Sequence, residues 1–168
     1  MAKSLYYLFF AVILLASCND DNDNPNNFLS GTYEIAWENT DTGIWFVDQY
    51  VFKSDGTYEY LHLLREEKNG DDLGYHGYSK GTYSLRGEDF TLKMTEASTL
   101  NYDDFPQGYT EALENLEAQE MSVDFVESEG TLKKLDSGKK ISILFECNDM
   151  LTESLASCIG ELVYDRVD

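Results

Sequence analysis

The clearest pattern of apolar and polar positions lies on both sides of Ser54-Asp55-Gly56. An apolar-rich run over residues 44–53 precedes this sequence, and a run of alternating apolar and polar side chains follows it over residues 57–65. Alternation with a period of two predicts β-strands, and a Ser-Asp-Gly turn between two such runs predicts a β-hairpin. The chain is therefore expected to reverse direction here between two paired strands.

The same alternation predicts the register of this hairpin. A two-residue turn would pair Phe52 with Glu59, which sets an apolar side chain against a charged one. A three-residue turn over 54–56 gathers the aromatic side chains on one face, because cross-strand partners share a face. Gly56 would then adopt the left-handed conformation that glycine tolerates. The pairs predicted for the three-residue turn are Phe52 with Tyr58, Tyr50 with Tyr60, Asp48 with His62 and Phe46 with Leu64.

The rest of the chain repeats the same kind of pattern. A first strand is predicted over 32–38, and a second hairpin over 77–95 with a two-residue turn that begins at Gly87 and pairs Leu85 with Phe90. Further strands are predicted over 121–127, 131–135, 139–147 and 161–167, with turns at 129–130 and 137–138. The spacing of apolar residues predicts one minor helix over 109–120. We expect an all-β domain, an antiparallel up-and-down barrel of eight or nine strands with that one helix.

Three short motifs resemble a known family. They are Gly-Thr-Tyr at 31–33, Phe-Lys-Ser-Asp-Gly-Thr-Tyr at 52–58, and the sequence from Gly81 to Leu92. Together they resemble the lipocalin-like domains of Bacteroidota lipoproteins. The resemblance implies a lipocalin-like β-barrel over residues 28–168, and it implies no catalytic residues.

The beginning of the chain has the features of a secretory leader. Lys3 precedes an apolar run over 5–16 that is shorter than the ~20 residues needed to cross a bilayer. Leu15-Ala16-Ser17-Cys18 resembles the bacterial lipobox, which implies a signal peptide over 1–17, cleavage before Cys18 and a lipid on that cysteine. The alternative is an ordinary signal peptide that happens to contain a cysteine.

Residues 18–27 are predicted to form an acidic tether, because none of residues 19–27 has an apolar side chain to bury. Acidic residues just after the lipidated cysteine resemble the signal that directs lipoproteins of Bacteroidota to the outer leaflet. Asp20, Asp21 and Asp23 match that signal, which implies an outer-membrane, lipid-anchored protein facing the cell exterior. A plain acidic spacer is the alternative.

Charge and cysteine content narrow the classes of partner. The formal net charge is −20, with 12 Lys and Arg against 32 Asp and Glu, which argues against nucleic acid as a partner. Cys147 and Cys158 are predicted to form a disulfide in an oxidising compartment, and two buried thiols are the alternative. The only histidines are His62 and His76, and neither lies near a Cys motif, so no metal site or cofactor is predicted.

The aromatic face of the central hairpin is the candidate ligand site. An eight-stranded barrel either fills its interior or holds one small ligand there. The predicted lining combines aromatic walls with a few polar groups, as small-molecule pockets do, and the same residues also describe a filled core. The functional classes are a binding protein for a small apolar or amphipathic molecule, a surface interaction or scaffold protein, and an enzyme using Asp48 and His62. The candidate residues are Phe46, Asp48, Tyr50, Phe52, Tyr58, Tyr60 and His62.

Overall fold

Alternating side chains produce a structure whose regular secondary structure is almost entirely β-strand. The computed structural model describes residues 29–120, 127–146 and 160–168. Their strands are β1 (Gly31–Glu38), β2 (Trp45–Phe52), β3 (Thr57–Arg65), β4 (Asp72–Arg86), β5 (Asp89–Thr99), β6 (Glu117–Ala118), β7 (Glu127–Leu135), β8 (Lys140–Phe145) and β9 (Leu162–Arg166).

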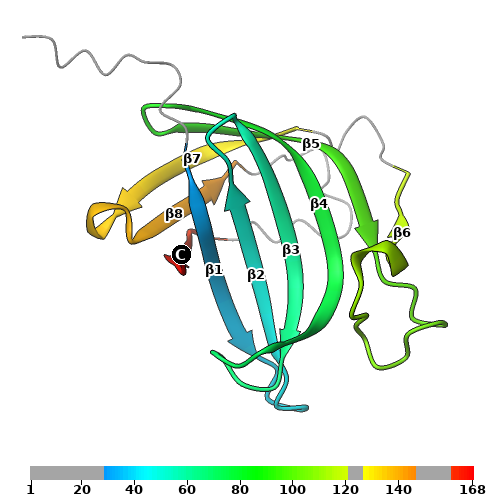
Figure 1. Cartoon of the computed structure of the whole chain (residues 1–168). Coiled ribbons are helices and arrows are strands. Elements are labelled where there is room, and N and C mark those ends of the chain that lie inside the picture. Colours follow the sequence, from blue (N-terminus) through cyan, green and yellow to red (C-terminus); the bar gives the residue numbers. More distant parts are fainter. Residues whose placement is uncertain (1–28, 121–126, 147–159) are drawn as a thin grey trace, which may run out of the picture.

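The strands form one antiparallel sheet that closes on itself. The order along the sheet is β4-β3-β2-β1-β9-β8-β7-β5-β6, and an additional pairing of β4 with β5 completes a ring (Figure 1). Each strand therefore lies beside the strand that precedes or follows it among those described. Apart from the pairing of β1 with β9, the first strand with the last, the one step along the ring that skips a strand is from β5 to β7. The predicted all-β, antiparallel, up-and-down arrangement is confirmed.

The ring is not a regular barrel. β9 pairs with β1 only at Tyr33 and Glu34, although β2 pairs with β1 along its whole length. β5 pairs with β7 over Asp89–Lys93 and with the short β6 at Ser98 and Thr99. Strands β7, β8 and β9 thus complete the ring at the end where β1 begins and the β2–β3 turn lies.

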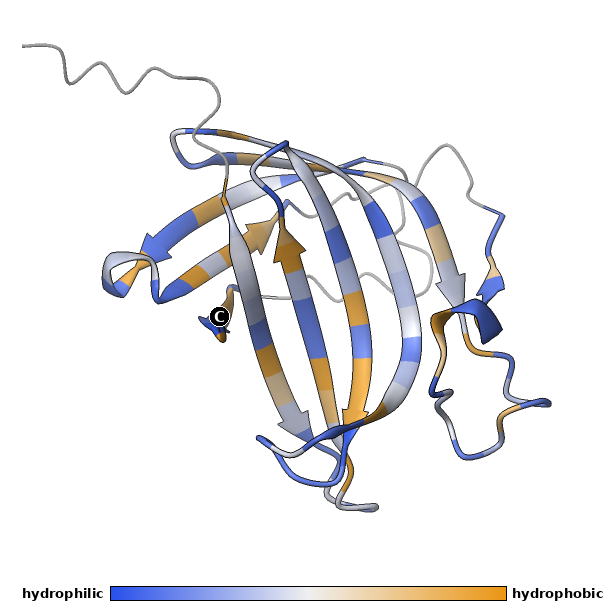
Figure 2. Ribbon diagram, in the orientation of Figure 1, coloured by the Kyte–Doolittle hydropathy of each residue, from blue (hydrophilic) through white to orange (hydrophobic). Residues whose placement is uncertain are grey.

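The main hydrophobic core fills that closed end. Hydrophobic and hydrophilic positions follow one another along the strands (Figure 2). Because successive side chains of a strand point to opposite faces, one set of them points into the ring. Tyr33, Phe52, Phe90, Ile141 and Tyr164 are each at most 2% exposed and belong to one core cluster. A second, smaller cluster of Val47, Leu61 and Leu63 lies apart from it, packed against Tyr75 and Tyr78 of β4.

Both predicted hairpin registers are confirmed. Phe52 pairs with Tyr58, Tyr50 with Tyr60, Asp48 with His62 and Phe46 with Leu64. Gly56 has φ +84°, the left-handed conformation expected of a three-residue turn. In the second hairpin Leu85 pairs with Phe90, and φ is +63° at Gly87.

The helix predicted over 109–120 is wrong. This segment contains a single 3₁₀ turn, Leu113–Asn115, followed by β6. Thr110 forms a β-bridge with Tyr75, with backbone N···O distances of 2.7 and 3.0 Å. A helix of twelve residues is marginal on its own, so backbone pairing to β4 and β5 prevails over helical spacing.

The turn predicted at 129–130 is also wrong, because both residues lie inside β7. Gly130 faces Phe90 of β5 and Phe145 of β8. A Cβ atom at this position would lie 2.3 Å from the carbonyl oxygen of Leu144. Glycine is therefore present because the neighbouring backbone comes close, not because the chain turns. The turn predicted at 137–138 is confirmed by the 3₁₀ turn Asp136–Gly138.

Candidate functional site

The inward faces of β2 and β3 form an aromatic wall that changes character along its length. At the closed end Phe52 and Tyr58 are 2% and 4% exposed, and they pack in the main core. Tyr60 is only partly buried, and the His62 side chain is 43% exposed. The wall therefore passes from a filled core to an accessible surface within a few residues.

Tyr50 is at the centre of this wall. Its ring centroid lies 4.4 Å from that of Tyr60, 5.3 Å from that of Phe52 and 5.4 Å from that of Tyr164. These separations are typical of stacked, tilted and edge-to-face aromatic pairs, which add to the stability gained from burial. The contacts restrict the movement of the tyrosine rings.

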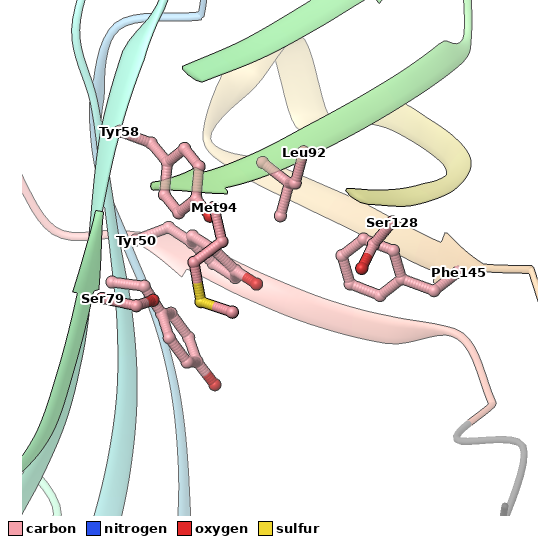
Figure 3. A pocket seen from close by; sticks show the side chains of 8 residues that line it. Tyr50, Tyr58, Ser79, Leu92, Met94, Ser128 and Phe145 are labelled. Atoms are coloured by element: carbon pink, nitrogen blue, oxygen red, sulfur yellow. The ribbon is translucent and has the colours of Figure 1, made fainter. Parts of the chain in front are cut away.

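A cavity of about 200 Å³ lies against these rings. Figure 3 shows the tyrosine rings of β2 and β3 on one side, Leu92, Ser128 and Phe145 on the other, and Met94 between them. Six strands contribute side chains to this tyrosine cavity, so its shape depends on closure of the ring. Its lining residues are Tyr50, Tyr58, Tyr60, Ser79, Leu92, Met94, Ser128 and Phe145.

The candidate residues predicted from the sequence separate into three groups. Tyr50, Tyr58 and Tyr60 line the tyrosine cavity. Phe52 packs among Tyr50, Tyr83 and Phe90 in the main core. Phe46, Asp48 and His62 share the inward face and lie outside the cavity lining. They lie closer to the opposite end of the ring, the open end, where β1 and β3 end and β2 begins.

Five residues that line the cavity were not predicted from the sequence. Ser79 lies on β4, and Leu92 and Met94 lie on β5, outside the hairpin that carries the candidate residues. Ser128 lies on β7 and Phe145 lies on β8. One signal in the sequence could have found Ser79 and Met94, which is the alternation of positions along β4 and β5. A period of two decides which residues of a strand share the face that points into the ring.

Asp48 and His62 form the polar part of the wall. The Oδ1 atom of Asp48 lies 2.6 Å from Nδ1 of His62. That oxygen is buried, and no partner among the described residues meets hydrogen-bond geometry with it. The contact is therefore an ion pair when the imidazole is protonated, and the carboxylate retains capacity to accept a hydrogen bond.

Burial perturbs the acid–base behaviour of the tyrosines. It raises the pKa of Tyr58 to about 12. It also raises the pKa values of Tyr50 and Tyr60 well above the ordinary value, and the nearby Asp48 carboxylate raises them further. The hydroxyl groups of the wall therefore stay neutral at physiological pH and can donate hydrogen bonds.

A second aromatic group lies near the open end. Trp37 stacks on Phe46 with centroids 6.2 Å apart, and Phe46 meets His76 edge to face at 6.3 Å. The Nδ1 atom of His76 lies 2.9 Å from the carbonyl oxygen of Gly108, and Nε2 lies 3.2 Å from the Tyr102 hydroxyl. These contacts give His76 a structural role in holding residues 102–108 against β4.

Several predicted sites lie outside the described residues. These are the signal peptide, the tether, Cys18, and the predicted pair of Cys147 and Cys158. Within the described ranges no group of three or more His, Cys, Asp and Glu side chains could hold a metal ion. The same ranges contain no helix long and apolar enough to cross a membrane.

Comparisons with known proteins found no matching family model, no matching curated protein and no matching solved structure. The resemblance of the three motifs to lipocalin-like lipoproteins therefore stays a prediction. What is established is an all-β, antiparallel ring with a cavity against its tyrosine wall.

Proposed function

We propose that this chain is a lipid-anchored surface protein that binds a small apolar or amphipathic molecule in the tyrosine cavity. The observation that carries the proposal is the position of the cavity, between the filled core and the open end of the aromatic wall. A ligand entering from the open end would meet fixed aromatic faces and a small number of hydroxyl groups. Such lining is typical of small-molecule sites.

The size of the cavity limits the ligand. A volume of about 200 Å³ is smaller than the ~300–1,000 Å³ of most small-molecule sites. An apolar cavity of ~150 Å³ is enough to hold benzene. The proposed ligand is therefore a compound with one ring, or a short aliphatic chain, and not a long acyl chain.

Polar groups at the rim favour a ligand with one polar substituent. The Tyr50, Tyr60 and Ser79 side chains line the cavity. The buried carboxylate of Asp48 lies next to the tyrosines, and its charge favours a cationic or hydrogen-bond-donating head group. The proposed role is binding and requires no catalytic step.

A filled-core scaffold protein is the second candidate. It is favoured by the closed end of the ring, where aromatic and aliphatic side chains form one core cluster and the Phe52 ring packs edge to face against Tyr83 and Phe90. In this interpretation the tyrosine cavity is a packing defect, and the exposed surface carries the function.

Ligand titration distinguishes the two candidates. Toluene, p-cresol and benzylamine share one ring and differ in their polar group, so they report on cavity and rim separately. The parent protein is expected to bind at least one of them saturably, with Ser79→Leu abolishing binding by filling the cavity and Tyr60→Ala weakening it. Glu59→Ala, on the opposite face of β3, serves as the control and should bind as the parent does.

Asp48→Asn tests the role of the carboxylate. The ammonium group of a bound benzylamine would extend past the cavity lining to this carboxylate, and a charge-assisted contact is worth roughly 1.5–3 kcal/mol. The variant should therefore weaken benzylamine binding by about tenfold and leave toluene binding within about twofold of the parent. The scaffold candidate predicts no saturable binding in the parent, and a loss of about 3–5 kcal/mol of stability for Tyr60→Ala. That pair of results would reject the binding proposal.

The membrane anchor is tested separately. Cys18→Ala should move the protein from the membrane fraction to the soluble fraction of the cell, because the proposed lipid is attached to that cysteine. If the variant loses its leader and still remains in the membrane fraction, the anchor is not at Cys18.

A further inference from the structure

Basic side chains gather at the turn between β7 and β8. Lys133 and Lys134 precede this turn and Lys139 and Lys140 follow it, and Arg166 lies beside it on β9. The backbone N–H of Arg166 donates to the carbonyl oxygen of Lys139 at 2.8 Å. These are five of the 12 Lys and Arg in a chain of net charge −20, so the local charge departs from that of the whole molecule.

A second cavity, of about 370 Å³, opens beside this turn. We name it the basic cavity. Its lining residues come from the chain just before β1, from β1 itself, from the end of β7, from the β7–β8 turn and from β9. Its volume falls within the ~300–1,000 Å³ typical of small-molecule sites. The lining residues are Leu29, Ser30, Tyr33, Lys134, Ser137, Gly138 and Arg166.

Alternation along β7 selects one lysine of the adjacent pair. Lys134 shares the inward face with buried Leu132, and Lys133 faces the opposite side. Lys133 lies 4.0 Å from Glu88, whereas no ion pair joins Lys134 to another described residue. Lys134 is therefore the lysine available to a ligand in the basic cavity.

Arg166 is held in position before a ligand binds. Its guanidinium lies over the ring of Tyr33, 5.7 Å from the centroid, and its Nε donates to Asp168 at 2.7 Å. A Cβ atom at Gly31 would lie 2.8 Å from Nη2, so glycine lets the guanidinium approach the strand backbone. A guanidinium has five N–H donors, and Asp168 engages the one at Nε.

The negative charge of the whole chain does not prevent an anion from binding here. At physiological ionic strength the Debye length is about 8 Å, so exposed carboxylates farther away are largely screened. Of the acidic side chains near the turn, Asp136 lies within it and interacts electrostatically with Lys140, Glu88 contacts Lys133, and Asp165 contacts Lys140. None of these three carboxylates belongs to the cavity lining. Asp168 is the acidic group that directly offsets Arg166.

We propose that the basic cavity binds a small organic oxyanion, a carboxylate or phosphate joined to a compact apolar body. Lys134 and Arg166 contact the oxyanion as charge-assisted donors, and the hydroxyls of Ser30 and Ser137 add hydrogen bonds. Leu29 and Tyr33 border the cavity and are 1% and 2% exposed, so the apolar body contacts only their edges. This site is separate from the tyrosine cavity and does not depend on the function proposed for it.

Calorimetric titration of the full chain with benzoate, phenyl phosphate and benzyl alcohol tests the proposal. Benzoate or phenyl phosphate should bind saturably, and the neutral benzyl alcohol should bind at least tenfold more weakly. Lys134→Ala should weaken oxyanion binding about tenfold or more, and Lys133→Ala, its neighbour of equal charge, should change it less than about twofold. Arg166→Lys, which keeps the charge and loses the planar fork, should also weaken binding.

Thermal melting of each variant shows whether it is folded, and p-cresol titration shows whether the tyrosine cavity is unchanged. The proposal is overturned if the parent shows no saturable oxyanion binding. It is also overturned if Lys133→Ala weakens binding as much as Lys134→Ala, because diffuse positive charge would then be sufficient.

Discussion

At the scale of single residues, tyrosine hydroxyl groups connect parts of the ring that are distant in sequence. The Tyr83 hydroxyl lies 2.5 Å from the carbonyl oxygen of Leu29 and 2.9 Å from that of Lys53. One hydroxyl on β4 therefore lies within hydrogen-bonding distance of carbonyl oxygens before β1 and at the β2–β3 turn, and its single proton is shared between them. Tyr83 itself is only 5% exposed, so water does not readily replace the hydroxyl.

Removing this hydroxyl should reduce stability measurably. Tyr83→Phe keeps the ring and removes the hydroxyl donor of the buried Leu29 carbonyl oxygen, which costs about 1–3 kcal/mol. Urea unfolding of parent and variant measures the change. The control is Tyr102→Phe, whose ring is 59% exposed and whose hydroxyl contacts His76 at 3.2 Å. It should change stability by less than about 0.5 kcal/mol. Equal losses in the two variants would contradict the role assigned to Tyr83.

At the scale of elements, glycines serve two distinct purposes in neighbouring parts of one hairpin. Gly130 lies within β7, where the backbone of β8 comes too close for a side chain. Gly138 lies in the turn that follows, where φ is +87° and a Cβ atom would meet nothing within 4 Å. The first site is limited by space and the second by backbone conformation.

These two limits predict different costs for the same substitution. Gly138→Ala should cost about 1–2 kcal/mol, the penalty of a left-handed conformation for an L-residue. Gly130→Ala should cost more, about 3 kcal/mol, because the Leu144 carbonyl must shift and the β7–β8 pairing with it. Chemical denaturation of both variants measures the difference. A smaller loss for Gly130→Ala than for Gly138→Ala would show that β8 moves away easily.

At the scale of the whole molecule, the ring encloses several neutral tyrosines. Burial raises the pKa values of Tyr50, Tyr60, Tyr83 and Tyr164, and raises that of Tyr58 to about 12. In the unfolded chain all of them ionise near pH 10. Below that pH both the folded and the unfolded state hold these protons, so the tyrosines contribute nothing to the pH dependence of stability there.

Stability is therefore expected to fall as pH rises above 10. The unfolded state releases tyrosine protons there and the folded state keeps them, so each buried tyrosine lowers the free energy of unfolding by about 1.4 kcal/mol per pH unit. For Tyr58 this loss continues to about pH 12. Urea midpoints between pH 8 and 11.5 measure it. Because surface lysines titrate in the same range, Tyr58→Phe isolates one tyrosine and should make the decline shallower. An unchanged slope would contradict burial of the Tyr58 hydroxyl.

The part of the candidate site that could be predicted from the sequence is the part formed by residues close together in the chain. Tyr50, Tyr58 and Tyr60 were found because one hairpin and its turn fix which side chains share a face. Ser128 and Phe145 were not found, because they reach the cavity only after β7 and β8 pair across the ring. Their sequence neighbourhoods carry no information about that distant contact.

The sequence by itself determined the strand class and the registers of the β2–β3 and β4–β5 hairpins. Side-chain alternation and turn glycines act between residues close in the chain, so they decide these features before any long-range contact forms. Tertiary structure alone decided that residues 109–120 pair with β4 and β5 in place of forming a helix. It also decided that Gly130 lies in a strand and that two cavities arise where the ring closes. These outcomes depend on backbone approach and space between distant segments, which local patterns do not encode.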